Sequence, residues 1–353
     1  MSVLWTNWLY FGLIIRIASS RPASPNVPSV HENIDRQIGW PRRPSLACTA
    51  QAGLAQPASY PSQRITLVVA FAPGGAADAI ARQVGPALSR RLGQPVVVEN
   101  RGGAAGSLGA RTVTGAHADG HTILVTTTSL LITEILSKTA GYSTAQLAAV
   151  AIPASTPEMF ATSAANPAKN LRDFLHGIRG KSITYATSGA GSGSHLGAAY
   201  FFEVLAKVSA VHVPYQGGGP AVAAAIGGHV DLVSNSLPAM IGPVQQGALK
   251  GLAVAGRERV AALLDVPTLK ELGYDYDEGT WVGFFVPAKT DPVIVAKLNR
   301  EINDIIRERD VHDRIGALGF LAEIRTPAET AHHLAEEAGK FRRIVEMTGI
   351  AAQ

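Results

Sequence analysis

Short apolar runs rich in β-branched residues alternate with helical patterns from residue 65 onward. Three runs in the first half predict strands, a buried one at 65–71 and two further ones at 95–100 and 121–129. Between the first two, apolar residues at i, i+4 spacing predict one face of a helix: Ile80, Val84, Leu88 and Leu92. Strand–helix–strand units of this length are typical of a parallel, doubly wound sheet.

The second half repeats this alternation without a detectable sequence repeat. Further strands are predicted at 182–188, 210–215, 230–236, 249–256 and 280–288. Helices are predicted within 189–207 and 217–228, and over 292–308 and 327–347. The strand at 280–288 is expected to return to the first sheet, because the helix after it carries an apolar stripe suited to packing on a sheet.

This order of elements predicts two α/β lobes, each a mainly parallel sheet flanked by helices. The first lobe is expected to comprise 60–157 together with 281–353, and the second 158–280. The chain would then cross between the lobes twice. Paired crossings form a hinge, and ligands commonly bind in the cleft between such lobes.

Residues 1–59 lack this pattern and are not expected to fold as a domain, since they are rich in Arg, Pro, Ser and Asn. Within them, Ala50-Gln51-Ala52 resembles a signal-peptidase site, which predicts export to the periplasm. The apolar stretch before it is shorter than the usual about 7–15 residues. A mis-set start or a damaged leader is the alternative. Cys48 leaves lipoprotein anchoring open, although Ser45 stands where such a signal has an aliphatic residue.

Composition narrows the function classes. Of the 353 residues, 46% are hydrophobic and 16% charged, which indicates a globular protein and excludes a disordered or coiled-coil one. The first 59 residues hold five Arg and two acidic residues, and therefore three of the four net positive charges. The remainder has no basic stripe for nucleic acid. A single cysteine excludes an internal disulfide and a Cys-based metal site.

Four glycine-rich loops follow predicted strands and lead into predicted helices: 72–78, 101–107, 188–195 and 215–220. Sites in open α/β sheets form at the carboxyl ends of the strands. A helix N-terminus there presents unpaired N–H groups at the positive end of its dipole. Four such loops together favour an anion cradle for a small carboxylate. The alternative is that each loop only caps its helix and closes a tight turn.

The candidate ligand-binding residues lie in these loops and at the strand ends: Phe71, Ala72, Gly74, Gly75, Ala76, Asp78, Ser107, Thr127, Thr128, Ser188, Gly189, Gly191, Ser192, His195, Tyr215, Gly217, Gly218 and Asn235. Asp78 has two interpretations. It would complement the dipole of its helix, or it would face the cleft and select an amine or hydroxyl of the ligand. Phe71 and Tyr215 would wall the site or pack in the core.

Enzyme signatures are absent, so neither a catalytic residue nor a cofactor or metal is expected. Gly180-Lys181-Ser182 resembles the end of a phosphate-binding loop, but the first Gly of that motif is replaced by Leu175. The loop 189–194 lacks the third Gly of a dinucleotide fingerprint. No nucleophile elbow occurs. His195 could serve as a base for a serine, but no acidic partner is evident in the sequence.

The motifs taken in order resemble the Bug family, the periplasmic substrate-binding components of tripartite tricarboxylate transporters. They include FAPGGAAD (71–78), VVVENRGGAAGS (96–107), SGAGSGSH (188–195) and VPYQGGGP (213–220). The resemblance runs from about residue 60 to the C-terminus. It implies a type II periplasmic-binding-protein fold, carboxylate capture by backbone N–H groups, a monomer, and delivery to a two-component membrane permease. It also implies that 71–78, 188–195 and 213–220 are ligand loops, with Asp78 at the acidic position.

Two departures leave the ligand open. The family usually has R-P-G-A-G-G where this chain has 101–106, and 126–136 replaces a more polar segment containing Asn and His. The sequence does not separate dicarboxylates, tricarboxylates, aromatic acids and amino acids. Two other functions compete: a cytoplasmic enzyme or nucleotide binder that uses the Gly-rich loops, and a receptor that feeds a signalling partner.

Overall fold

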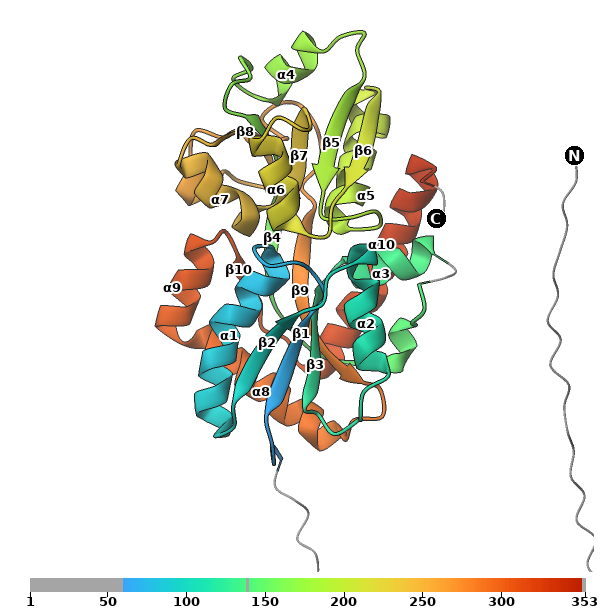
Figure 1. Ribbon diagram of the computed structural model, residues 1–353, viewed down its shortest axis with the longest axis vertical. Helices are drawn as coiled ribbons and strands as arrows, with labels where there is room; N and C mark the ends of the chain where they lie inside the picture. The colour runs from blue at the N-terminus through green and yellow to red at the C-terminus, as the bar shows by residue number, and fades with distance from the viewer. Residues whose placement is uncertain (1–59, 138–139, 351–353) are drawn as a thin grey trace, which may run out of the picture. The chain divides into compact units, whose positions relative to one another are not determined.

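The computed structural model describes residues 60–137 and 140–350 (Figure 1). The predictions for 1–59, including the leader and Cys48, lie outside the described residues. These described residues belong to one compact unit. Its backbone has two sheet sections joined through one long strand.

The first section begins with parallel strands. β1 (Ile65–Val69) pairs with β2 (Val96–Asn100) on one side and with β3 (Thr122–Thr127) on the other. β9 (Gly279–Pro287) returns to this section antiparallel to β3, as the sequence predicts. The helices of this part of the chain are α1 (Ala76–Leu92), α2 (Ser107–Thr114), α3 (Ser129–Leu136), α8 (Pro292–Arg307), α9 (Arg309–Ala317) and α10 (Pro327–Thr348).

The second section holds β5 (Ile183–Thr187), parallel to both β6 (Ala210–Pro214) and β7 (Leu232–Ser236). β8 (Leu249–Ala255) lies antiparallel to β4. The helices here are α4 (Leu171–Gly177), α5 (Gly193–Ala199), α6 (Gly218–Ile226) and α7 (Leu237–Gln245). A π-helical segment, Tyr200–Ala206, continues α5.

β4 (Leu147–Ser163) connects the two sections (Figure 1). Its residues up to Pro157 pair with β9, and Glu158 onward pairs with β7 and β8. The short β10 (Leu321–Ala322) adds to its first half. The sequence analysis did not predict this 17-residue strand. It places Glu158 and the start of β9 between the two sections.

The hydrophobic core follows the same division. One cluster of buried side chains covers β1, β3, the first half of β4 and β9, with α1 and α8 packed on it. Two further clusters fill the second section, one under α6 and α7 and one that includes Phe160, Phe201 and Phe202. The stripe predicted along α8 is confirmed, because Leu298, Ile302 and Ile305 are fully buried.

Candidate functional site

The loop that follows β1 touches the loop that follows β6. The backbone N–H of Ala72 donates to the carbonyl of Gln216 at 3.1 Å. A Cβ placed on Gly75 would lie 3.6 Å from the backbone nitrogen of Gly218. Gly75 and Gly217 are the N-caps of α1 and α6, and neither helix has a side-chain cap. Two uncapped helix N-termini therefore face each other across the two sections.

A small cavity, here called the cleft cavity, lies at this junction. It is lined by Phe71, Gly75, Ala76, Ala77, Thr127, Glu158, Ser188, Gly193, Ser194, Gly218, Asn235, Ser236 and Thr280. Four helices begin at this cavity: α1, α5, α6 and α7. Its volume is ≈ 20 Å³, room for about one water molecule. Entry of a larger guest therefore requires the wall of the cavity to rearrange.

The electrostatics of the cleft cavity favour an anion. Positive ends of several helix dipoles converge on it, which stabilises a negative charge placed between them. None of the described lining residues is Lys, Arg or His. Two lining side chains have buried polar atoms without a hydrogen-bond partner in the described chain, Oε2 of Glu158 and Nδ2 of Asn235. Such atoms are normally paired, so both have unused hydrogen-bonding capacity towards a guest.

Hydroxyl-bearing residues also line the cavity, namely Thr127, Ser188, Ser194, Ser236 and Thr280, and some of them pair with hydroxyl groups just outside it. The Oγ atoms of Ser188 and Ser194 lie 2.9 Å apart, and Ser192 Oγ lies 3.0 Å from Ser194 Oγ. Thr128 and Thr280 share a hydroxyl hydrogen bond of 2.8 Å that joins α3 to β9. Because hydroxyl groups rotate, these pairs can turn a donor towards a ligand oxygen.

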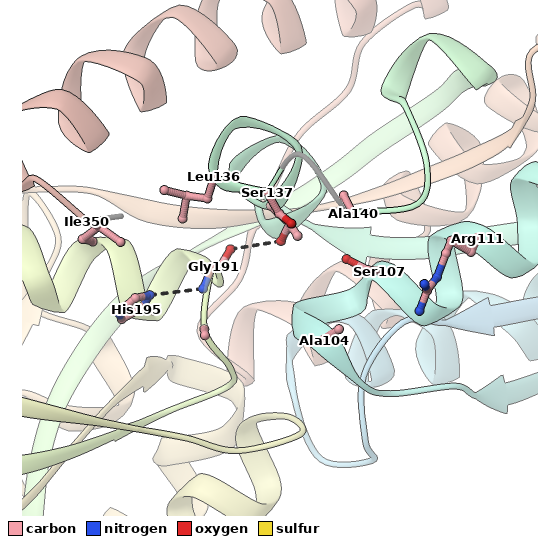
Figure 2. Close-up of a pocket in the computed structure, with 11 residues that line it drawn as sticks. Ala104, Ser107, Arg111, Leu136, Ser137, Ala140, Gly191, His195 and Ile350 are labelled. Carbon is pink, nitrogen blue, oxygen red and sulfur yellow. Dashed lines mark hydrogen bonds between the residues drawn. The ribbon is translucent and has the colours of Figure 1, made fainter. Parts of the chain in front are cut away.

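A second cavity of ≈ 270 Å³, the side chamber, opens beside the loop of α5 (Figure 2). It is lined by Ala104, Ser107, Arg111, Thr133, Leu136, Ser137, Ala140, Ala190, Gly191, His195 and Ile350. The Oγ of Ser107 is buried there without a partner in the described chain. Most of the wall is apolar and suits a carbon skeleton, and Arg111 adds a cationic side chain to it.

His195 is a neutral structural side chain. Its Nδ1 accepts a hydrogen bond from the Gly191 N–H at 3.1 Å (Figure 2), and its ring stacks on His212 at 3.8 Å. Burial lowers the pKa of His195 to about 4. Burial, together with the neighbouring His195, lowers the pKa of His212 to about 3. Two neutral, stacked imidazoles supply no charge at neutral pH.

Asp78 is buried, and its carboxylate is occupied within its own section. Oδ2 accepts from the Gly74 N–H at 3.1 Å and from Arg82 Nε at 3.0 Å, and Oδ1 accepts from Asn100 Nδ2 at 2.9 Å. Burial alone would raise the pKa of Asp78, but the hydrogen bonds from Arg82, Asn100 and Gly74 outweigh it and lower the pKa. This geometry supports the structural interpretation of Asp78.

The candidate residues fall into three groups. Seven line the cleft cavity: Phe71, Gly75, Ala76, Thr127, Ser188, Gly218 and Asn235. Three line the side chamber instead: Ser107, Gly191 and His195. Eight line neither cavity: Ala72, Gly74, Asp78, Thr128, Gly189, Ser192, Tyr215 and Gly217. Of these eight, Ala72 and Gly217 pack against each other at the loop junction, and Ser192 caps α5 by accepting from the His195 N–H at 3.1 Å.

Several lining residues were missed by the sequence analysis. Glu158 lies in the unpredicted strand β4, Thr280 lies in β9, and Ser236 is the last residue of β7 and the N-cap of α7. Only long-range strand pairing brings these three to the loops. The loop 101–107, predicted to join the cleft, reaches the side chamber through Ala104 and Ser107.

The described residues lack two other features. No group of three or more His, Cys, Asp or Glu side chains there could hold a metal ion. Over the same residues, no helix combines the length and apolar character needed to cross a membrane.

Comparisons with known proteins agree with this architecture. Residues 80–350 match the family described as the tripartite tricarboxylate transporter family receptor. BugT of Bordetella pertussis is 33% identical over 313 residues, covering 85% of this chain and 94% of BugT.

Two solved structures were described with ligands. Rpa4515 of R. palustris with adipate is 28% identical, with a TM-score of 0.80 over 83% of this chain and 99% of that one. MatC from Rhodopseudomonas palustris with bound malate is 31% identical, with a TM-score of 0.76 over 81% and 100%. These likenesses confirm the predicted two-lobed fold and the resemblance to Bug proteins. The chain therefore belongs to the tripartite tricarboxylate transporter receptor family, a family of periplasmic binding proteins.

Proposed function

We propose that this protein is an extracytoplasmic solute-binding protein that captures a small carboxylate between two lobes. The lobes are 60–157 with 281–353, and 158–280, so that β4 and β9 form the hinge. The protein then delivers its cargo to a two-component membrane permease. Binding without turnover is expected, because a receptor that releases its cargo unchanged needs no catalytic group.

The observation that carries this proposal is the meeting of helix N-termini at the cleft cavity. The N-termini of α1 and α6 come within contact distance, uncapped, with no cationic side chain in the wall. Two positive dipole ends repel each other, so an anion between them stabilises the closed arrangement. Several backbone N–H groups can bind a small anion such as a carboxylate without a counter-charge. The relatives described with adipate and malate point to the same class of cargo.

The carboxylate is proposed to contact the predicted residues that line the cleft cavity: Phe71, Gly75, Ala76, Thr127, Ser188, Gly218 and Asn235. The side chamber would take part of a larger carbon skeleton, with Ser107 as a hydroxyl contact. Membership of the family supports both the proposed export to the periplasm and the proposed permease partner.

Titration calorimetry of the full-length protein, unfolded and refolded to remove carried-over ligand, tests this function. The panel contains citrate, succinate, malate, adipate, aspartate, glutamate, nicotinate and benzoate. We expect at least one acid to bind with a Kd of about 1 μM or tighter. If the folded protein binds none of these acids, the proposal is wrong.

Two serine variants test the location of the site. Ser188→Ala removes a hydroxyl from the cleft cavity and should weaken binding severalfold. Ser209→Ala removes an exposed hydroxyl that donates to Ser182 at 3.0 Å and should leave binding unchanged. Equal affinity of the two variants would place the site elsewhere.

A further inference from the structure

Glu158 stands out among the residues that line the cleft cavity. It is the only one of those described with an ionisable side chain. Its residue is 5% exposed, and its Oε2 atom has no hydrogen-bond partner within the described chain. It sits in β4 opposite Ser236 of β7 and Ala255 of β8, where the strand passes from one sheet section to the other. The carboxyl group therefore faces the same space as the helix N-termini without being used by the fold.

No charge close to Glu158 offsets its burial. On α5, the nearest titratable side chain is the neutral His195. Before β9, Tyr276 is buried and its hydroxyl has a pKa well above its usual value. The acids Asp277 and Glu278 in that segment form ion pairs with Arg257 and Lys340. Within the described chain, no cationic side chain and no N–H group donates a hydrogen bond to Oε2 of Glu158, although helix N-termini open onto the same cavity.

The neutral form of the carboxyl group is favoured under these conditions. An unpaired carboxylate in an apolar interior carries a large desolvation penalty, and the group takes up a proton instead. Burial raises the pKa of Glu158 to about 8. At neutral pH the side chain therefore carries an O–H donor. No other side chain of the described wall is a carboxylic acid, so none has an O–H group as acidic as this one.

We propose that Glu158 contacts the cargo as a neutral carboxylic acid and donates its proton in a hydrogen bond to an oxygen of the cargo carboxylate. This inference rests on the proposed function. A hydrogen bond from a neutral acid to a carboxylate is charge-assisted and strong. An ionised Glu158 would instead repel an anion in this dry cavity. Asn235 Nδ2, also without a partner in the described chain, offers a second donor from the adjacent strand.

The proposal also defines the class of cargo. Backbone N–H groups, an acid O–H and an amide N–H are all donors, so the site suits an acceptor-rich acid such as a dicarboxylate. An amino acid whose ammonium group faced Glu158 would need the ionised side chain. The affinity for a dicarboxylate should fall as the pH rises, whereas the affinity for such an amino acid should rise.

The test is calorimetry of wild type, Glu158→Gln and Glu203→Gln with every acid of the panel that binds, at about pH 7 and about pH 9.5. For wild type, affinity should fall about thirtyfold across this interval, because each bound carboxylate requires one proton on Glu158. Glu158→Gln keeps an N–H donor and does not ionise, so its affinity should be the same at both pH values. Glu203→Gln, an exposed glutamate on the π-helical segment, should follow wild type.

A second readout needs no cargo. Carboxyl ¹³C NMR of glutamate-labelled, ligand-free protein, with the resonance identified by its loss in Glu158→Gln, should give a titration midpoint near the pKa stated above. A midpoint in the ordinary range of glutamate would overturn the proposal. Wild-type affinity that is constant, or that rises with pH, would overturn it as well, and a rise would assign an ammonium group to the cargo. If no acid of the panel binds, the proposed function is wrong. The NMR midpoint would still decide the protonation state of Glu158.

Discussion

At the scale of single residues, Asp78 ties the loop after β1 to the helix that follows it. Its carboxylate accepts from the N–H of Gly74, four positions earlier, and from the side chain of Asn100 on β2. Asn100 in turn donates to the carbonyl of Phe71 at 3.0 Å. These contacts fix the loop from within, and the loop then presents its glycines to the other sheet section.

Asp78→Ala should therefore lower stability more than it lowers affinity. The substitution removes two hydrogen bonds that part-buried donors, the Gly74 N–H and Asn100 Nδ2, make to a carboxylate, a loss of about 1–3 kcal/mol in the free energy of unfolding. Arg82 adds little, because half of its side chain is exposed. The lowered pKa of Asp78 means that its stabilisation is complete above the unfolded-state pKa and is lost as pH falls through the folded-state value. Urea unfolding at about pH 7 and about pH 3 should show the difference from wild type shrinking in acid.

Asp310→Ala is the matched control. Asp310 is exposed and pairs with Arg314 within α9, so its removal should leave the urea unfolding curve nearly unchanged. If Asp78→Ala instead keeps the stability of wild type and loses affinity only for aspartate and glutamate, the second interpretation of Asp78 is correct. Asp78 would then contact the amine of the ligand.

At the scale of elements, the sequence pattern predicted eight strands of the described chain and missed β4 and the two-residue β10. β1, β3, β5 and β7 are apolar runs that end in a turn, so local pattern suffices. β4 contains Pro153 and Pro157, which argue against a strand interior. The structure accommodates this stretch with register shifts against β9 between Ala149 and Ala154. Only pairing with strands far away in sequence stabilises it.

The same limit applies to the candidate site. The loops before α1, α5 and α6 could be predicted, because a Gly-rich turn between a strand and a helix is a local signal. Glu158 and Thr280 could not, since their place in the wall depends on how β4 and β9 cross. The contact between Asp78 and Asn100 could not be predicted from the sequence either, because Asn100 lies on another strand.

Gly219→Ala tests whether ligand binding requires close approach of the loop after β1 to the loop after β6. A Cβ at Gly219 would lie 2.6 Å from the backbone carbonyl oxygen of Pro73, across the junction of the two sections. Since Gly219 lies inside α6, alanine should be tolerated there in the open form or even favour the helix by up to about 1 kcal/mol. We expect unchanged or slightly higher stability in urea and at least a tenfold loss of affinity for the bound acid.

Gly242→Ala provides the comparison, because Gly242 lies inside α7 and a Cβ there meets nothing within 4 Å. It should keep the affinity of wild type. Wild-type affinity in Gly219→Ala as well would show that binding does not require the closed contact between the two loops.

At the scale of the molecule, the closed arrangement leaves almost no space in the cleft cavity, so binding must be coupled to opening. β4 and β9 are the strands that join the two sheet sections, and they pair side by side from Pro157 and Gly279 towards the first section. α10 packs on both α3 and the π-helical segment after α5, so it would slide as the lobes separate. A ligand that contacts both lobes shifts the population towards the closed state.

Energy transfer between two labels should report this shift. Arg309 at the start of α9 and Arg257 after β8 have side chains 96% and 90% exposed, and both can be replaced by Cys in a Cys48→Ser background that has no other thiol. Because the labels lie on different lobes, transfer efficiency should change when a panel acid binds and should return to its starting value when the acid is dialysed away. The same labels combined with Gly219→Ala should keep the ligand-free efficiency at acid concentrations that saturate the wild type. An efficiency that never changes with bound acid would mean that the lobes do not move, and the cleft cavity of about one water molecule could then not be the carboxylate site.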